Sequence, residues 1–247
     1  MDYGLLQQGQ YDAARRHLDL MRANLAAAPT AGRQGALLAM RAHYLIETEN
    51  WTDDAAGWTL DAPLAGQVPK AMDKFALGYA ALRRGDRRAA ERGLGELRVL
   101  AKKLEGDTSY VGNRRIPGVL ATELEAALLA NRGKPQQAID LLRAVTRESD
   151  AFPSEFGPPD IVKPTHELLG ELLIASGRPA ESAQEFTRAL ELAPGRSAAL
   201  LGLARAPRAA GDTAAAERAL SQLESNWTNA DQTLPSLLEL RRMRAER

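Results

Sequence analysis

Apolar residues recur along most of the chain at spacings of three and four, the period of an amphipathic helix. Single Gly residues and short polar clusters interrupt this pattern where turns are expected. The predicted helices span 2–8, 10–28, 33–49, 51–58, 68–84, 86–105, 117–132, 135–148, 163–176, 179–193, 196–210, 212–226 and 234–246. The pattern therefore predicts an all-α protein whose helices follow one another through short turns.

Composition strengthens this prediction. The chain contains 45 Ala and 37 Leu but only 11 Val and Ile together among its 247 residues. Ala and Leu favour helices, whereas strands are rich in β-branched and aromatic residues. We therefore expect the core to be built by helix packing, without a sheet.

The clearest internal repeat lies near the C-terminus. Residues 166–194 and 200–228 each contain an apolar helix, a Gly turn and a second helix, and Gly177 and Gly211 are 34 positions apart. Similar segments place turns near positions 9, 49, 85, 133, 177 and 211. They predict six units in a single domain over 1–247, at 1–30, 33–60, 68–105, 117–148, 163–195 and 197–228, with a capping helix at 234–246.

The unit at 163–195 carries residues that identify a family resemblance. Leu169-Gly170, Ser182, Phe186, Ala189 and Pro194 stand at the spacing of the tetratricopeptide repeat, and the Ala/Arg-rich composition is typical of a bacterial member. The chain resembles this family over all six units. The resemblance implies a right-handed α-solenoid in which a small residue lets two helices approach and a bulky one fills the gap to the next unit.

In tetratricopeptide repeat proteins, the first helix of each unit lines a concave groove that binds peptides or proteins. The resemblance therefore implies a groove whose side chains are aromatic, then acidic, then basic in successive units. The candidate groove residues are Phe75, Tyr79, Arg83, Glu123, Asn131, Glu167, Glu171, Arg205 and Arg208. This set lacks the basic run and the Asn pair of members that bind chaperone tails, so we do not expect that partner.

Candidate chemistry is sparse. The chain has no Cys, and its three His residues stand in different units without metal-ligand spacing, so we expect no metal site and no thiol chemistry. His166 occupies a packing position between helices. Glu167 and Glu171 share a helix face, but no nucleophile or phosphate-binding loop accompanies them. We predict no catalytic residues and no cofactor.

The charge of the chain limits the classes of binding partner that we expect. The sequence has 32 basic and 32 acidic residues, which argues against bulk nucleic-acid binding. The basic run Arg83, Arg84, Arg87, Arg88 and Arg92 favours either an anionic contact or a solvated turn balanced by nearby carboxylates. No segment is apolar enough to span a membrane. The first residues lack the features of a signal peptide, which favours the cytoplasm, although the chain begins inside a helix.

Three irregular features stand out. Residues 106–116 and 149–163 form long connections, and loops of this length are often functional. The aromatic rings of Phe152 and Phe156 in the second are expected to anchor it in a groove between repeats. Pro207 lies inside a first helix, and it predicts a kink or an early helix end near 203–206.

Three functions remain open. The first is a non-catalytic scaffold that binds a protein or peptide in the groove. The second is a C-terminal regulatory or sensor arm of a longer signalling or enzymatic protein, favoured by the truncated first unit. The third is an enzyme with a site between the 149–163 loop and the groove. The absence of catalytic motifs favours the scaffold, and neither its partner nor its oligomeric state follows from the sequence.

Overall fold

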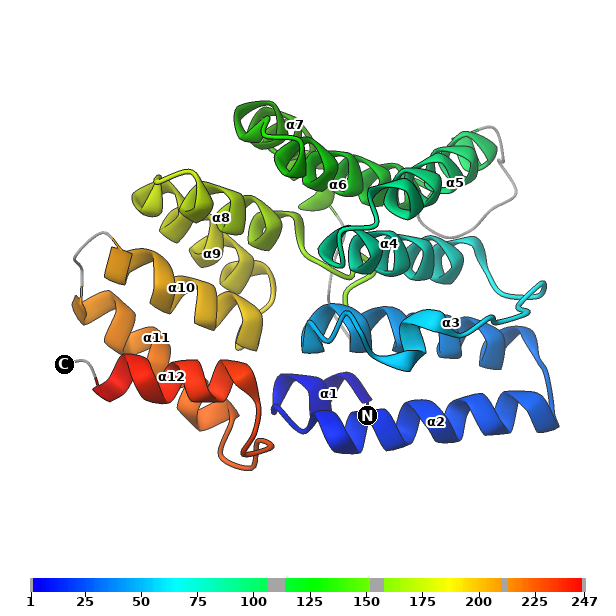
Figure 1. The fold of residues 1–247 in the computed structure, drawn as a ribbon, viewed down its shortest axis with the longest axis horizontal. Helices are drawn as coiled ribbons and strands as arrows, with labels where there is room; N and C mark the ends of the chain where they lie inside the picture. Colours follow the sequence, from blue (N-terminus) through cyan, green and yellow to red (C-terminus); the bar gives the residue numbers. More distant parts are fainter. Residues whose placement is uncertain (1, 106–113, 152–157, 210–212, 246–247) are drawn as a thin grey trace. The chain divides into compact units, whose positions relative to one another are not determined.

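The computed structural model describes residues 2–105, 114–151, 158–209 and 213–245, and within these ranges every regular element is helical (Figure 1). The elements are α1 (Asp2–Gln7), α2 (Tyr11–Ala27), α3 (Ala31–Thr48), the 3-10 helix η1 (Asp54–Gly57), α4 (Gln67–Arg83), α5 (Arg87–Glu105), α6 (Ile116–Asn131), α7 (Pro135–Ser149), α8 (Thr165–Ala175), α9 (Pro179–Leu192), α10 (Ser197–Ala209), α11 (Thr213–Asn226) and α12 (Pro235–Ala245). Consecutive helices pack in neighbouring pairs, as the repeat pattern predicts for a helical solenoid. The right-handed sense of that solenoid stays a prediction.

The predicted turns are confirmed where the structure describes them. Gly9, Gly85, Gly133 and Gly177 all have positive φ, and Glu49 at the second turn also adopts the left-handed conformation at 51°. Gly reaches this region at little cost and ends a helix there. Position 211 lies outside the described residues.

Two local predictions are wrong. The segment 51–58 forms only one turn of 3-10 helix, Asp54–Gly57. The second predicted repeat, 33–60, therefore has a long first helix and almost no second helix. The helix α10 continues to Ala209, so the early end predicted from Pro207 is wrong, while the alternative, a kink near 203–206, stays a prediction. All other predicted helix ends agree with the structure to within two residues.

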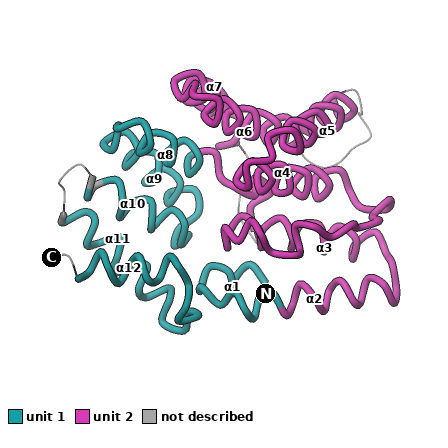
Figure 2. The backbone as a smooth tube through the Cα atoms, viewed as in Figure 1, with its two compact units in different colours: residues 1–15, 166–247 teal, residues 16–165 magenta. Residues whose placement is uncertain are grey.

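The chain divides into two compact units, residues 1–15 with 166–247 (unit 1) and residues 16–165 (unit 2) (Figure 2). In unit 2, α3 packs on α4, α4 on α5 and α6, and α6 on α7. Gly78 and Gly93 let α4 and α5 approach closely, since a Cβ added to Gly93 would lie 3.3 Å from Gly78 Cα. Leu124 from α6 packs against Gly78, and both Leu124 and Phe75 are buried.

In unit 1, Phe186 on α9 joins two repeats. Its ring lies against Gly170 on α8 and Gly202 on α10, where added Cβ atoms would collide with it. Ser182 Oγ donates to the Gly170 carbonyl at 2.8 Å and ties α9 to α8. This arrangement confirms the roles predicted for the small and bulky repeat positions.

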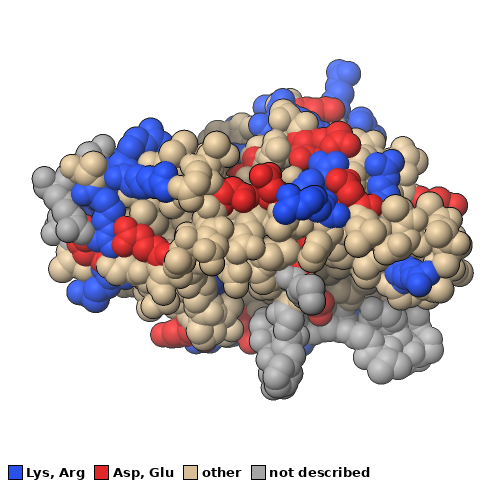
Figure 3. Space-filling model, turned by 90° about the horizontal axis from the view of Figure 1, so that it is seen from below, with Lys and Arg blue, Asp and Glu red and all other residues tan. Residues whose placement is uncertain are grey.

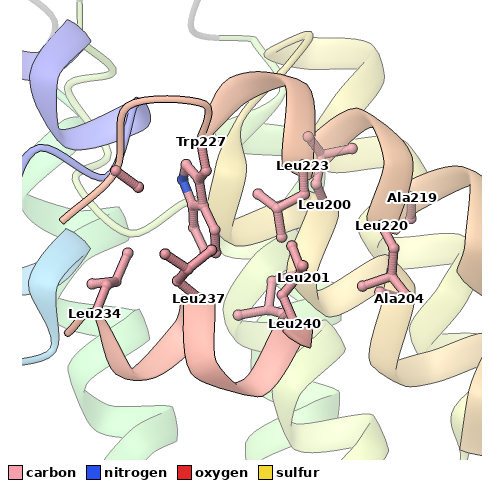
Figure 4. Close-up of a cluster of buried hydrophobic side chains, with 11 residues drawn as sticks. Leu200, Leu201, Ala204, Ala219, Leu220, Leu223, Trp227, Leu234, Leu237 and Leu240 are labelled. Carbon is pink, nitrogen blue, oxygen red and sulfur yellow. The ribbon is translucent and has the colours of Figure 1, made fainter. Parts of the chain in front are cut away.

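The C-terminal core of unit 1 gathers around Trp227 (Figure 4). Leu220 and Leu223 on α11 meet Leu200 from α10, and Leu237 from α12 completes the cluster. The predicted last helix thus contributes apolar side chains to the repeat stack that it follows.

Residues 1–15 belong to unit 1 although they are far from it in sequence. Ser197 N and Oγ donate to Gln7 Oε1 and Gln7 O at 2.9 and 2.6 Å. Asp231 N donates to the Gly9 carbonyl at 3.0 Å, and Asp12 N donates to Asp231 Oδ2 at 2.9 Å. The α1–α2 turn is therefore held by the start of α10 and by the connection between α11 and α12, a contact that repeat periodicity does not predict.

Candidate functional site

The nine candidate groove residues differ sharply in exposure. Four are buried with at most 5% of their surface exposed, and these are Phe75, Tyr79, Glu123 and Glu167. The remaining five keep exposed surface, and these are Arg83, Asn131, Glu171, Arg205 and Arg208. A partner can therefore reach only the second set directly, while the groove assignment as a whole stays a prediction.

In unit 2, the two buried aromatic candidates, Phe75 and Tyr79, form part of an aromatic cluster. The rings of Phe75 and Tyr79 stack with centroids 5.7 Å apart, and Trp51 meets Tyr79 edge-on at 5.5 Å. Arg83 lies 5.9 Å over the Trp51 ring. Aromatic contacts of this geometry each add about 0.5–1.5 kcal/mol beyond burial, so the cluster makes a rigid base at the end of α4.

The chain itself supplies a segment that lies on these first-helix residues. Lys163 Nζ is 5.8 Å over the Tyr79 ring, and Thr165 Oγ1 donates to Glu123 Oε1 at 2.6 Å. Val162, next to Lys163, is completely buried. The end of the 149–163 connection therefore contacts Tyr79, and the first residue of α8 contacts Glu123. The role predicted for Phe152 and Phe156 falls outside the described residues.

In unit 1, Glu167 is engaged by Arg196, and both side chains are at least 98% shielded from solvent. Arg196 Nη1 also donates to the Tyr3 hydroxyl at 2.5 Å. The carboxylate predicted as a groove charge is therefore part of a buried ion pair that reaches α1. Glu171, one turn later, remains half-buried on α8.

The two basic candidates of α10 both contact α12. Arg205 binds Glu239 with two parallel hydrogen bonds of 2.8 and 2.6 Å. The hydrogen bond from Arg205 holds the pKa of Glu239 below its usual range, against the opposing effect of partial burial. Arg208 Nη1 donates to the Met243 carbonyl at 3.0 Å. These contacts fix both guanidinium groups at the surface of unit 1.

A buried charge pair that the sequence analysis missed lies in unit 2. Arg41 on α3 binds both carboxylate oxygens of Asp73 on α4 at 2.7 and 2.6 Å, and Arg41 Nη1 donates to the Trp58 carbonyl at 2.7 Å. Burial raises the pKa of Asp73, and the hydrogen bond from Arg41 opposes that rise. The available signal was a charged residue on the apolar face of each of two consecutive first helices.

His166 occupies the packing position predicted for it. It is buried, and its Nδ1 lies 2.6 Å from Glu185 Oε2 on α9. Among the described residues, no group of three His, Cys, Asp or Glu side chains is placed to hold a metal ion.

Two segments of the chain match models of a known family. The tetratricopeptide repeat matches residues 173–226, from the end of α8 through α11, and residues 3–19, from α1 into α2. The chain therefore contains tetratricopeptide repeats. No match was found for it among curated proteins or among solved structures.

Tetratricopeptide repeats generally mediate protein–protein interaction, so the two matches support a role as an interaction scaffold. The matched residues 3–15 and 173–226 belong to unit 1, where Gln7 and Gly9 are hydrogen-bonded to Ser197 and Asp231. None of the helices in the described part of the chain combines the length and the hydropathy that crossing a bilayer requires.

Proposed function

We propose that this tetratricopeptide repeat protein is a non-catalytic scaffold that binds a peptide or protein segment on the first helices of its repeats, the predicted concave groove. The observation that supports this proposal is a set of contacts within the chain itself. In unit 2, the chain that leads into α8 already lies on two of the predicted groove positions, since Lys163 contacts Tyr79 and Thr165, the first residue of α8, contacts Glu123. First-helix residues of this protein therefore accept side chains from the end of a connection and from the helix start that follows it.

The contacts of that segment indicate the chemistry involved. The Tyr79 ring faces a cation, Glu123 accepts a hydroxyl, and neighbouring aliphatic side chains are buried. Cation–π contacts contribute about 0.5–2 kcal/mol and hydrogen bonds to charged groups about 1.5–3 kcal/mol. Such directional contacts fix the position of a bound chain.

In unit 1, the corresponding helices offer partly exposed charges of both signs, Glu171 on α8 and Arg205 on α10. We infer that a partner segment binds there through polar side chains that match this charge order. Because Arg205 is already held by Glu239, its guanidinium is fixed in place before binding, which lowers the entropy cost of association.

A peptide selection tests the proposal. Peptides displayed on phage are selected on the wild-type protein, and their affinities are then measured for Arg205→Gln and for the control Arg218→Gln. Arg218 is exposed on the second helix α11, so the control removes the same charge outside the first helices. We expect selected peptides to bind Arg205→Gln about fivefold more weakly, in line with one lost charge contact, and to bind the control normally. Failure to select peptides, or equal binding to both variants, would refute groove binding.

The remaining predictions from the sequence stay predictions. These are the regulatory or sensor arm of a longer protein, the single domain over 1–247, the bacterial type and the cytoplasmic location. None of them is needed for the groove proposal.

A further inference from the structure

The helix turns of unit 2 carry a concentration of cationic side chains that the groove proposal does not use. We name the exposed residues at the α4–α5 and α6–α7 turns the basic edge, and it consists of Arg84, Arg87, Arg88, Arg132 and Lys134. Within residues 83–92 and 131–137, the carboxylates are Asp86 and Glu91. In a chain of zero net charge, the edge is therefore a local excess of positive charge.

Contacts between the repeats hold these turns side by side. Arg87 Nε and Nη2 donate to Asn131 Oδ1 at 3.3 and 3.2 Å, which joins the α4–α5 turn to the end of α6. Arg132 pairs with Glu91 at 2.6 Å across the same boundary. Arg84 Nη1 donates to the Trp51 carbonyl at 2.6 Å and ties in the preceding turn. The edge is thus a continuous surface made by successive repeats.

Helix electrostatics account for only part of this charge. Arg84 and Arg132 follow the carboxyl ends of α4 and α6, where cations stabilise the helix dipole. Arg88 lies in the first turn of α5, and Lys134 immediately precedes α7, so both stand at amino ends where cations are unfavourable. Neither first turn contains an acidic residue. Folding stability therefore does not explain why Arg88 and Lys134 are cationic.

These two side chains are also available for binding. Both are exposed, and within the described part of unit 2 neither has an ion-pair or hydrogen-bond partner for its charged group. Asp86 is occupied locally, since its Oδ1 accepts from Ala89 N at 2.9 Å at the start of α5. Glu91 is engaged by Arg132. The two neighbouring carboxylates therefore leave Arg88 and Lys134 unneutralised.

We propose that the basic edge binds an acidic segment of a protein partner, a stretch rich in Asp and Glu. Arg guanidinium groups match carboxylates with paired hydrogen bonds, and the turns present several such groups on one rigid surface. Nucleic acid requires a broader electropositive surface. On the one face drawn in Figure 3, cationic and anionic side chains lie beside one another, so positive charge does not spread over that face. The edge lies at the helix turns and adjoins the predicted groove at Asn131, but it is far in sequence from the groove charges Glu171 and Arg205 of unit 1.

Fluorescence anisotropy with a fluorescein-labelled polyglutamate peptide tests the proposal on the full chain. The test variant carries Arg88→Glu and Lys134→Glu. The control carries Lys102→Glu and Lys103→Glu, which makes the same change of net charge at the other, exposed end of α5. We expect the test variant to bind about tenfold or more weakly, because two exposed charge contacts are reversed. The control should bind like the wild type, and wild-type binding should weaken as salt rises.

Several outcomes would overturn the proposal. They are no binding of polyglutamate by the wild type, an equal loss in test and control variants, or tighter binding of duplex DNA or phosphatidylserine vesicles than of the peptide. Thermal unfolding of both variants by circular dichroism shows whether they are folded. If the double variant unfolds, Arg88→Gln and Lys134→Gln, which remove the charges without reversing them, give the same comparison. Because Arg205→Gln leaves the basic edge intact, the groove and the edge can fail independently.

Discussion

Phe186 sits between two helices from different repeats, and the cost of crowding it can be worked out from the structure. A Cβ added to Gly202 on α10 would lie 2.5 Å from Phe186 Cδ1 and closer still to Cε1 and Cζ. The ring is only 1% exposed, so it has no open side into which it can move. The substitution Gly202→Ala therefore forces either the ring or α10 to shift.

Two opposing effects set the size of the change. Replacing Gly by Ala in a helix interior stabilises by about 1 kcal/mol. Overpacking a well-filled core costs about 1–3 kcal/mol and occasionally more. Contact with three atoms of a buried ring favours the upper end, so we expect a net loss of about 2 kcal/mol, which corresponds to a melting temperature lower by roughly 4–8 °C.

Circular dichroism during thermal unfolding measures this change. Gly95→Ala is the matched control, because Gly95 is exposed on α5 and nothing lies within 4 Å of an added Cβ. That variant should be more stable than the wild type by about 0.5–1 kcal/mol. Combining Gly202→Ala with Phe186→Leu should give a coupling energy of about 1 kcal/mol or more, since the smaller side chain relieves the clash. If Gly202→Ala raises the melting temperature as Gly95→Ala does, Phe186 does not fill the space between these repeats.

Two further predictions concern charged pairs. Asp73→Ala leaves the Arg41 guanidinium buried without its carboxylate and should lower the free energy of unfolding by about 3–5 kcal/mol in a denaturant titration; a loss below about 1 kcal/mol would show that solvent reaches this pair. The ionised form of Glu239 is favoured in the folded state, so its contribution to stability is present above its ordinary pKa of 4.5 and is lost as pH falls through the lowered pKa. Arg205→Gln should move the Glu239 pKa measured by NMR titration upward and weaken this acid dependence, and an unchanged pKa would contradict the assignment to Arg205.

Most of the helices could be predicted from the local sequence pattern, because the helix period and the turn residues are properties of short segments. The exception, 51–58, shows what overrides them. The Asp53 carboxylate accepts hydrogen bonds from Ala55 N and from the Tyr44 hydroxyl, both at 2.9 Å. Arg41 Nη1 donates a hydrogen bond to the Trp58 carbonyl. Arg41 of α3 and the Asp53 side chain, which Tyr44 of α3 holds in place, thus bind backbone groups that a second helix would need for its own hydrogen bonds. Their positions depend on the tertiary fold.

The candidate site was less predictable than the fold. A family pattern assigns Glu123 and Glu167 to a first-helix face, but it contains no information on which side chains cover them. Their partners are Thr165 and Arg196, which lie outside the helices that carry the two carboxylates. These contacts come from a helix start and from the residue before another helix, whose positions depend on connecting segments that vary in length and path within repeat proteins. By contrast, Arg83 at the last turn of α4 is exposed, as a helix-end position favours.

The attachment of residues 1–15 to the start of α10 and to the connection between α11 and α12 has a consequence for the order of folding. In an ordinary repeat array each repeat contacts its neighbours, so structure can propagate along the chain as it is synthesised. Here the segment ending in the α1–α2 turn can meet Ser197 and Asp231 only after nearly all of the sequence has been made. Closing so long a loop costs only about 0.6 kcal/mol more for each doubling of its length. We therefore expect residues 16–165 to fold first and the attachment of α1 to be the step that completes unit 1.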